Sequence, residues 1–159
     1  MDLIVDNRQK EIQIDEEMID LLKKTVLQCL KAESRELDCE ISISFVDDNE
    51  IRQLNKEYRG IDKATDVLSF SMMDGDEIIK HSLPILLGDI VISAQSALRQ
   101  SNEFGHTLER EIVYLTVHSM LHLLGYDHLN KEDKKRMRER EKEIMKLLGI
   151  FKNNCDVGV

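Results

Sequence analysis

The stretch TLEREIVYLTVHSMLHLLGYDH, residues 107–128, decides the fold that we expect. Thr107 can start a helix there, and Gly125 permits a left-handed turn that ends it. Apolar side chains within this helix are candidates to face a core, namely Ile112, Leu115, Met120, Leu121 and Leu124. The stretch therefore predicts a helix packed against other elements, with an ordered turn behind it.

Segments before and after this helix alternate between strand and helix patterns. Residues 39–46 place Cys39, Ile41, Ile43 and Phe45 opposite polar neighbours, which is the period-two pattern of a half-buried strand. Three further strands are predicted at residues 3–5, 66–71 and 86–93, with Asp74, Gly75 and Pro84 in the loop between the last two.

Four further helices are expected outside the central stretch. Their predicted starts are Asp15, Asp47 or Asp48, Ser93 and Lys131, and their ends lie near Leu30, Leu54, Gly105 and Leu148. Helices and strands mix without strict βαβ alternation, and the chain of 159 residues is long enough for one core. We therefore predict a single α+β domain over residues 1–159, with one small mixed sheet of about four strands covered by helices.

Three histidines in the central stretch have the spacing of metal ligands. His118 and His122 are four residues apart, so on a helix they share one face about one turn from each other. The turn at Gly125 can bring His128 back toward this pair. Three imidazoles with a fourth position free for water are the ligand set of a catalytic zinc ion. The alternatives are two packed core histidines or a purely structural zinc.

The spacing HxxxHxxGxxH resembles that of zinc peptidases, with one difference. Those enzymes carry a glutamate general base after the first histidine, where this chain has Ser119. Peptide hydrolysis by that mechanism is therefore not expected. Glu111 is a weak candidate base two turns before His118, and the alternative is a salt bridge within its own helix. His81 and His106 lie in loop-like sequence and receive no role.

Cysteine usage and the N-terminal sequence indicate a compartment. Cys29, Cys39 and Cys155 are odd in number, widely spaced and form no CxxC pair. Neither a disulfide framework nor a thiolate metal site is suggested, which fits a reducing cytoplasm. The start lacks a basic region and a long apolar run, so we expect a soluble protein that is not exported.

The net charge of −9 is distributed unevenly. Residues 1–50 hold 14 acidic and 6 basic side chains, and the remainder holds 17 and 16. The acidic part suggests a protein contact, while the part with the histidines is nearly neutral. Basic residues crowd the last predicted helix: Lys131, Lys134, Lys135, Arg136, Arg138, Arg140, Lys142 and Lys146. Such a run is usually a solvated face, and the alternative is a surface that binds phosphate.

A second polar segment, LNKEYRGIDKATDVLSF at residues 54–70, precedes a predicted strand. Arg59 offers a planar, permanently charged guanidinium that can bind phosphate oxygens, and Gly60 permits close backbone approach. The competing interpretation is a surface arginine paired with Asp62 or Glu57.

Three motifs together resemble the bacterial YbeY endoribonuclease family. They are LNxxYRGxDxxTDVLSF, Leu87-Gly88-Asp89-Ile90 and HSMLHLLGYDH, and they occur in the family's order over residues of about 40–128. Two positions depart from the family's usual pattern: Ser71 stands where proline is frequent, and Ser119 where glycine is.

The resemblance implies a zinc-dependent, cytoplasmic endoribonuclease that prefers single strands. It implies a role in ribosomal RNA maturation at the 3′ end of the small-subunit RNA, and in ribosome quality control. By similarity, His118, His122 and His128 are metal ligands, and Arg59 and His118 are catalytic positions. The implied partners are ribosomal RNA, the small ribosomal subunit and its assembly factors, with no membrane and no DNA.

Two other functions keep part of this pattern. A metal-dependent hydrolase of a small molecule or peptide would use the histidines and leave Arg59 unexplained. A non-enzymatic, ribosome-associated module would have a structural ion and bind RNA through the basic last helix. Asp127 can orient an imidazole or simply belong to an exposed turn. The residues do not identify the general base, nor whether water or the RNA 2′-hydroxyl attacks.

Overall fold

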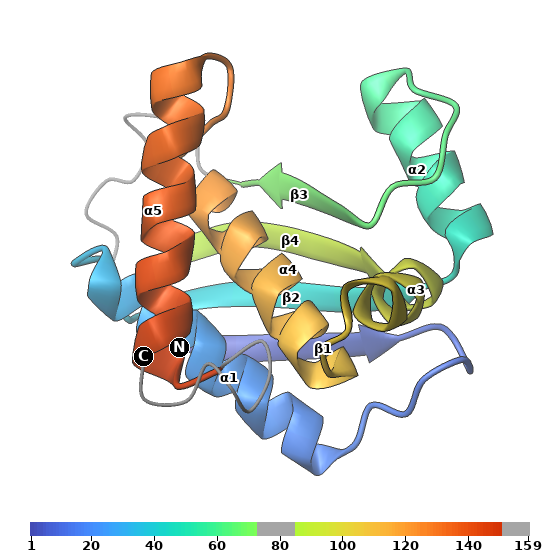
Figure 1. Cartoon of the computed structure of the whole chain (residues 1–159), viewed down its shortest axis with the longest axis horizontal. Coiled ribbons are helices and arrows are strands. Elements are labelled where there is room, and N and C mark those ends of the chain that lie inside the picture. The colour runs from blue at the N-terminus through green and yellow to red at the C-terminus, as the bar shows by residue number, and fades with distance from the viewer. Residues whose placement is uncertain (73–84, 151–159) are drawn as a thin grey trace.

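The computed structural model describes residues 1–72 and 85–150, and within them four strands form one mixed sheet (Figure 1). The strands are β1 (Asp2–Asn7), β2 (Cys39–Val46), β3 (Val67–Ser71) and β4 (Ile85–Ser93), in the order β1-β2-β4-β3. β1, β2 and β4 are parallel, whereas β3 runs antiparallel to β4 at the edge. The predicted α+β class and mixed sheet are confirmed. The predicted loop residues Asp74, Gly75 and Pro84, together with His81 and Cys155, lie outside the described residues.

Five helices accompany the sheet in the described ranges: α1 (Glu16–Ala32), α2 (Asp48–Arg59), α3 (Ala94–Phe104), α4 (Leu108–Leu123) and α5 (Lys131–Leu148). Each begins after a residue whose side-chain oxygen accepts a hydrogen bond from a backbone N–H of the first turn: Asp15, Asp47, Ser93, Thr107 and Asn130. The predicted starts at Asp15, Ser93 and Thr107 are confirmed, and Asp47 is the cap of α2.

The prediction that α2 ends at Leu54 is wrong, because the helix continues to Arg59. The buried residues of α2 are Ile51 and Asn55. Because Asn55 is polar, the helical pattern of apolar residues ends before the helix itself does. The Asn55 amide donates to the Lys63 carbonyl at 2.8 Å, which stabilises the chain that follows. Arg59 therefore lies on the last helical turn and not in a loop.

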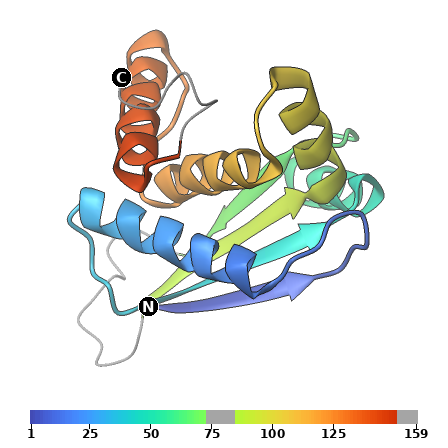
Figure 2. The ribbon, with the colours of Figure 1, turned by 60° about the horizontal axis from the view of Figure 1, so that its bottom comes forward.

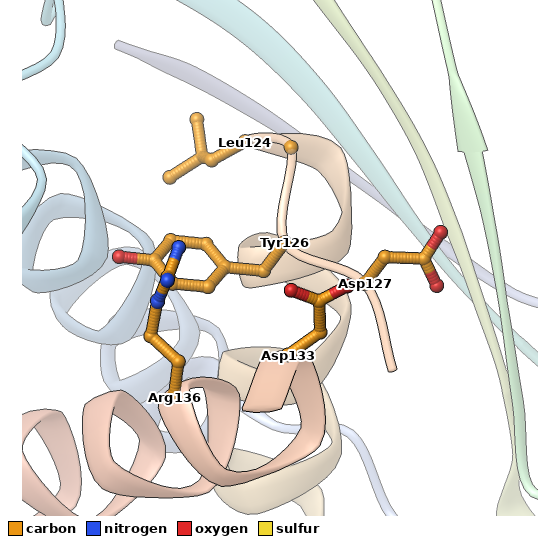
Figure 3. A pocket seen from close by; sticks show the side chains of 6 residues that line it. Leu124, Tyr126, Asp127, Asp133 and Arg136 are labelled. Carbon is orange, nitrogen blue, oxygen red and sulfur yellow. The ribbon is translucent and has the colours of Figure 1, made fainter. Parts of the chain in front are cut away.

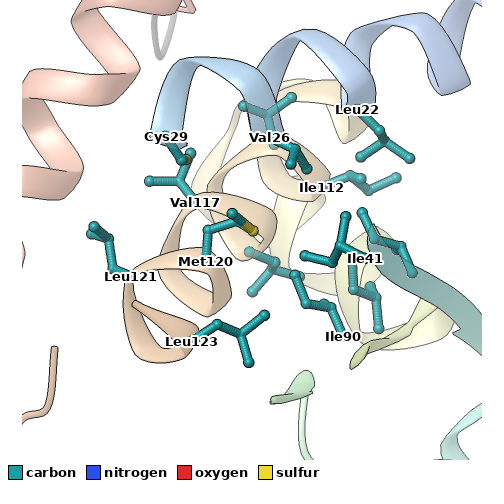
Figure 4. Packing of buried hydrophobic residues seen from close by; sticks show 14 of the residues in the cluster. Leu22, Val26, Cys29, Ile41, Ile90, Ile112, Val117, Met120, Leu121 and Leu123 are labelled. Atoms are coloured by element: carbon teal, nitrogen blue, oxygen red, sulfur yellow. The ribbon is translucent and has the colours of Figure 1, made fainter. Parts of the chain in front are cut away.

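The main core lies between the sheet and α1 and α4, which cover the same face (Figure 2). Figure 4 shows Leu22, Val26 and Cys29 of α1 meeting side chains of α4 and of the sheet. All five apolar residues predicted to face inward from the histidine helix are buried: Ile112, Leu115, Met120, Leu121 and Leu124. Met120 is thus a core residue, as expected.

A smaller apolar cluster on the opposite face holds α2 in place. Val46 and Val91 follow core residues on β2 and β4, so they point to the other side of the sheet. Ile51 of α2 packs there with them and with Leu68 of β3. This packing sets the C-terminal end of α2 beside β3.

Gly88 allows β3 and α4 to approach β4 closely. It has φ +155°, and a Cβ atom built there would clash with the Phe70 carbonyl oxygen and lie 2.9 Å from Leu123 Cδ2. A β-bulge at Leu87 precedes it in the pairing of β2 with β4. The glycine of the Leu-Gly-Asp-Ile motif thus brings the strand after Arg59 and the histidine helix together.

Cys29 and Cys39 are buried free thiols, and burial raises the pKa of Cys29 to about 12. Both therefore behave as packed apolar side chains. Among residues 1–72 and 85–150, no helix has the combined length and hydropathy that crossing a bilayer requires.

Candidate metal centre

Three imidazoles converge at the end of α4. His118 and His122 lie on one face of its last two turns, and His128 lies in the segment that follows. One ring nitrogen from each residue lies within 4.8 Å of the other two, and the Nε2 atoms of His118 and His122 are 3.2 Å apart. Tetrahedral coordination with Zn–N distances of ~2.0–2.1 Å separates two ligand nitrogens by about 3.3 Å. His118 and His122 therefore have the separation of two ligands of one tetrahedral ion, and His128 lies close enough to be a candidate third ligand.

The helix end brings His128 to this pair. The backbone N–H groups of Gly125 and Tyr126 donate to the carbonyls of His122 and Leu121, at 3.1 and 2.9 Å. Gly125 has φ +105°, a conformation that other residues rarely adopt. The imidazole of His128 consequently lies with its centroid 4.9 Å from that of His122. This is the turn that the sequence predicted.

A backbone carbonyl orients His122. Its Nδ1 lies 3.1 Å from the Tyr126 carbonyl oxygen, which can only accept, so Nδ1 carries the proton and Nε2 keeps its lone pair toward the other histidines. Burial lowers the pKa of His122, and the imidazoles of His118 and His128 lower it further. Both effects favour the neutral imidazole that a metal ion needs.

Two other helices hold the turn that contains Tyr126. Its hydroxyl donates to both carboxylate oxygens of Glu33 in the segment after α1, at 3.1 and 3.2 Å. Arg140 of α5 donates to the same carboxylate at 2.8 Å and to the Ala32 carbonyl at 2.9 Å. Figure 3 shows the Tyr126 side chain pointing away from the strands and that of Asp127 pointing toward them. The carbonyl that orients His122 is thus fixed to α1 and α5.

Glu141 of α5 lies behind His118. Its carboxylate is buried, its Oε1 lies 3.5 Å from His118 Nδ1, and its Oε2 accepts from the Tyr114 hydroxyl at 2.9 Å. Burial and the adjacent carboxylate raise the pKa of Tyr114, so the hydroxyl remains a donor. A carboxylate behind a ligand histidine fixes the tautomer and the ring orientation. Sequence reasoning missed Glu141; the available signal was one acidic residue among the inward apolar positions of α5.

Glu141→Gln is expected to weaken metal binding by about tenfold to a hundredfold, because the amide supports a donating Nδ1–H less strongly. Metal affinity can be measured by competition with a chromophoric chelator. Glu139→Gln, an exposed acid on the same helix, is the matched control and should bind as the wild type does. Wild-type affinity in Glu141→Gln would contradict this orienting role.

Two acids considered in the sequence have other partners. Glu111 is 3 % exposed, and its Oε2 lies 2.5 Å from His106 Nε2, while burial raises its pKa. It pairs with His106 at the start of its helix and does not line the cleft of the histidines. Asp127 accepts a hydrogen bond from the backbone N–H of His128 at 2.7 Å, so it belongs to the turn and, within the described residues, does not orient an imidazole.

Ser119, one of the two departures from the family pattern, is fully buried and does not line the cleft of the histidines.

Arg59 and the three histidines line one cleft of about 850 Å³, which also includes Tyr58 and Phe70. Within the described part of the chain, Arg59 forms no ion pair. Asp62, one of its two expected partners, pairs instead with Arg52 at 2.8 Å. Gly60 caps α2 in the left-handed conformation and has open space around it. The guanidinium is therefore available to an anionic ligand in the cleft.

One basic residue of α5 forms ion pairs within the protein. Arg140 pairs with Glu33 and Glu143, at 2.8 and 2.6 Å, so it serves the contact between α1 and α5. Whether the remaining basic residues contact RNA stays a prediction.

Comparisons with known proteins agree with the motifs. The family model described as Endoribonuclease YbeY matches residues 4–149. The Endoribonuclease YbeY of Desulforamulus reducens is 50% identical, and the match covers 94% of this chain and 99% of the relative. That of Clostridioides difficile is 47% identical, with 94% and 98% covered. A solution structure of a Thermotoga maritima protein aligns with a TM-score of 0.59 over 99% of both chains at 24% identity, which supports the fold.

Proposed function

Because this chain belongs to the Endoribonuclease YbeY family, we propose that it is a zinc-dependent endoribonuclease that cleaves single-stranded ribosomal RNA. One observation carries the proposal: three convergent histidine nitrogens and a guanidinium without an ion-pair partner among the described residues line the same cleft. The histidines supply ligands for one ion, and Arg59 supplies a charge complementary to phosphate.

The residues divide the chemistry between them. His118, His122 and His128 would hold the ion, with Glu141 and the Tyr126 carbonyl keeping two imidazoles in the ligating tautomer. When bound, such an ion polarises a phosphoryl oxygen and lowers the pKa of a bound water to about 7. Arg59 binds the scissile phosphate and stabilises the charge that develops on it. The turn segment fixed by Glu33 and Arg140 keeps the histidines in place during this step.

The biological setting forms part of the same proposal. We propose maturation of the 3′ end of the small-subunit RNA and ribosome quality control, in the cytoplasm and with small-subunit proteins and assembly factors as partners. The acidic N-terminal third offers a surface for such protein contacts, because ribosomal proteins are generally basic.

Cleavage of a 5′-labelled single-stranded ribosomal RNA fragment tests the activity. Metal-stripped protein should be inactive, zinc should restore cleavage, and the same sequence in a duplex should be cut at least about tenfold more slowly. A panel of peptides should remain intact. Cleavage of the peptides without cleavage of RNA would contradict the proposal and favour a peptide hydrolase.

A further inference from the structure

An exposed aromatic ring stands at the rim of the cleft beside Arg59. Tyr58, on the last turn of α2, is 64% exposed. Its hydroxyl forms no hydrogen bond to any described residue. The chain is poor in aromatic residues, with three Tyr, four Phe and no Trp. Among the described aromatic residues, Tyr58 and Phe104 are largely exposed, and of these two only Tyr58 lines the cleft of the histidines.

Phe70 supports this ring from the sheet. The two rings meet edge to face, with centroids 5.4 Å apart and planes at 65°. Phe70 is half-buried on β3 and packs against the cluster beneath α2. Tyr58 is thus held from one side while most of its surface remains open, so a ligand that contacts it orders little additional structure.

We propose that Tyr58, supported by Phe70, is a stacking platform for one unpaired nucleobase of the RNA. The inference rests on the proposed endoribonuclease function and adds a base-binding position to the cleft. Tyr58, Arg59 and the histidines line this one cleft. Neighbouring residues on a helix diverge by about 100°. Tyr58 and Arg59 therefore contact different groups of the same strand, a base and a phosphate.

Charge favours an RNA strand in the cleft of the histidines over one in the hollow on the opposite side of Tyr58. Among the described residues that line the hollow on that side, over the open face of the sheet, Asp6, Glu50 and Asp89 are acidic and Arg8 alone is basic. Arg8 already pairs with Asp6 and Glu50, at 2.7 and 2.8 Å. A phosphate chain there would meet three carboxylates and one base that is already paired. The cleft is lined by two carboxylates, Asp66 and Asp127, and by Arg59, which has no ion-pair partner among the described residues and can bind a phosphate.

Stacking on Tyr58 provides a physical reason for a preference for single strands. A base inside a duplex is stacked on both faces by its neighbours and has no face left for a side chain. An unpaired base can leave its neighbours and lie on the ring. Recognition of this kind is tolerant of sequence, because every base has a planar face.

Binding of a fluorescein-labelled single-stranded RNA to metal-stripped protein tests the proposal without cleavage. Tyr58→Ala and Tyr58→Leu should each weaken binding about 5- to 100-fold, and Tyr58→Phe should remain within about twofold of the wild type. The slope of log Kd against log salt should stay unchanged in Tyr58→Leu, because no phosphate contact is lost. In Arg59→Ala the slope should fall by about 0.7.

A fluorescent reporter locates the base directly. The chain contains no tryptophan, so Tyr58→Trp introduces a single indole at the platform. Single-stranded RNA should quench its emission, and a fully abasic strand of the same length, which keeps the phosphates and lacks the bases, should not. Phe104→Trp, an exposed site on α3 outside the cleft, is the control and should show no quenching.

Failure of the stacking platform and failure of the proposed function give different results. If the wild type cleaves RNA but Tyr58→Leu binds it as tightly as the wild type does, the stacking platform is wrong and the proposed function stands. If the wild type neither binds nor cleaves RNA, the proposed function itself fails. Because Tyr58 is exposed, its variants should keep the wild-type melting temperature, and a loss of binding in them reports on the platform.

Discussion

Arg59→Ala is expected to slow RNA cleavage by about a hundredfold to a thousandfold and to leave the bound metal unchanged. The guanidinium lines the cleft of the histidines, and no described carboxylate pairs with it. Removing one positioned donor from a developing anion costs about 10²–10³ in rate. Cleavage under single-turnover conditions measures the rate, and elemental analysis measures the metal.

Arg52→Ala is the matched control for this variant. Arg52 lies on the same helix, is exposed, and pairs with Asp62 outside the cleft, so its removal should change cleavage by less than about threefold. Arg59→Lys should retain part of the rate, because it keeps the charge and loses the planar fork. Loss of metal in Arg59→Ala would contradict the division of roles between Arg59 and the histidines.

His122→Ala is expected to weaken zinc binding by about a thousandfold. If three histidines share an apparent binding free energy of ~10–16 kcal/mol, removing one costs about 4 kcal/mol. The core does not depend on this side chain, which is half-buried beside the imidazoles of His118 and His128. Competition with a chelator measures the affinity, and circular dichroism measures the fold.

The stability of the same variant separates a catalytic ion from a structural one. Metal-free His122→Ala should melt at about the temperature of metal-free wild type. Unfolding of His122→Ala at room temperature would indicate that the ion is structural, as the non-enzymatic alternative requires.

Local signals made much of this fold predictable. The alternation at residues 39–46 matched β2, and the capping residues Asp15, Ser93 and Thr107 each start a helix where they were expected to. Such signals act over a few residues, so one sequence displays them directly. The prediction failed at α2, where Asn55 faces inward and interrupts the apolar period.

The candidate site was predictable only where its residues lie close together in the chain. The spacing of His118, His122 and His128 indicated their convergence. Apart from the Tyr126 carbonyl at His122, the supporting groups are distant in the chain: Glu141 is 23 positions from His118, and Arg140 is 108 positions from Ala32. Contacts over such separations follow from the packing of α1, α4 and α5, which no local pattern specifies.

Cleavage of a single-stranded ribosomal RNA fragment by wild type and His122→Ala, purified side by side, tests the central claim most directly. Both proteins are stripped of metal and then assayed before and after zinc is added, so a contaminating nuclease would appear equally in both. We expect cleavage in the zinc-loaded wild type alone. Cleavage that is equal in both proteins before zinc is added would come from a contaminating nuclease. Cleavage that appears in both proteins to the same extent only after zinc is added would contradict the claim that the three histidines form the site of the reaction.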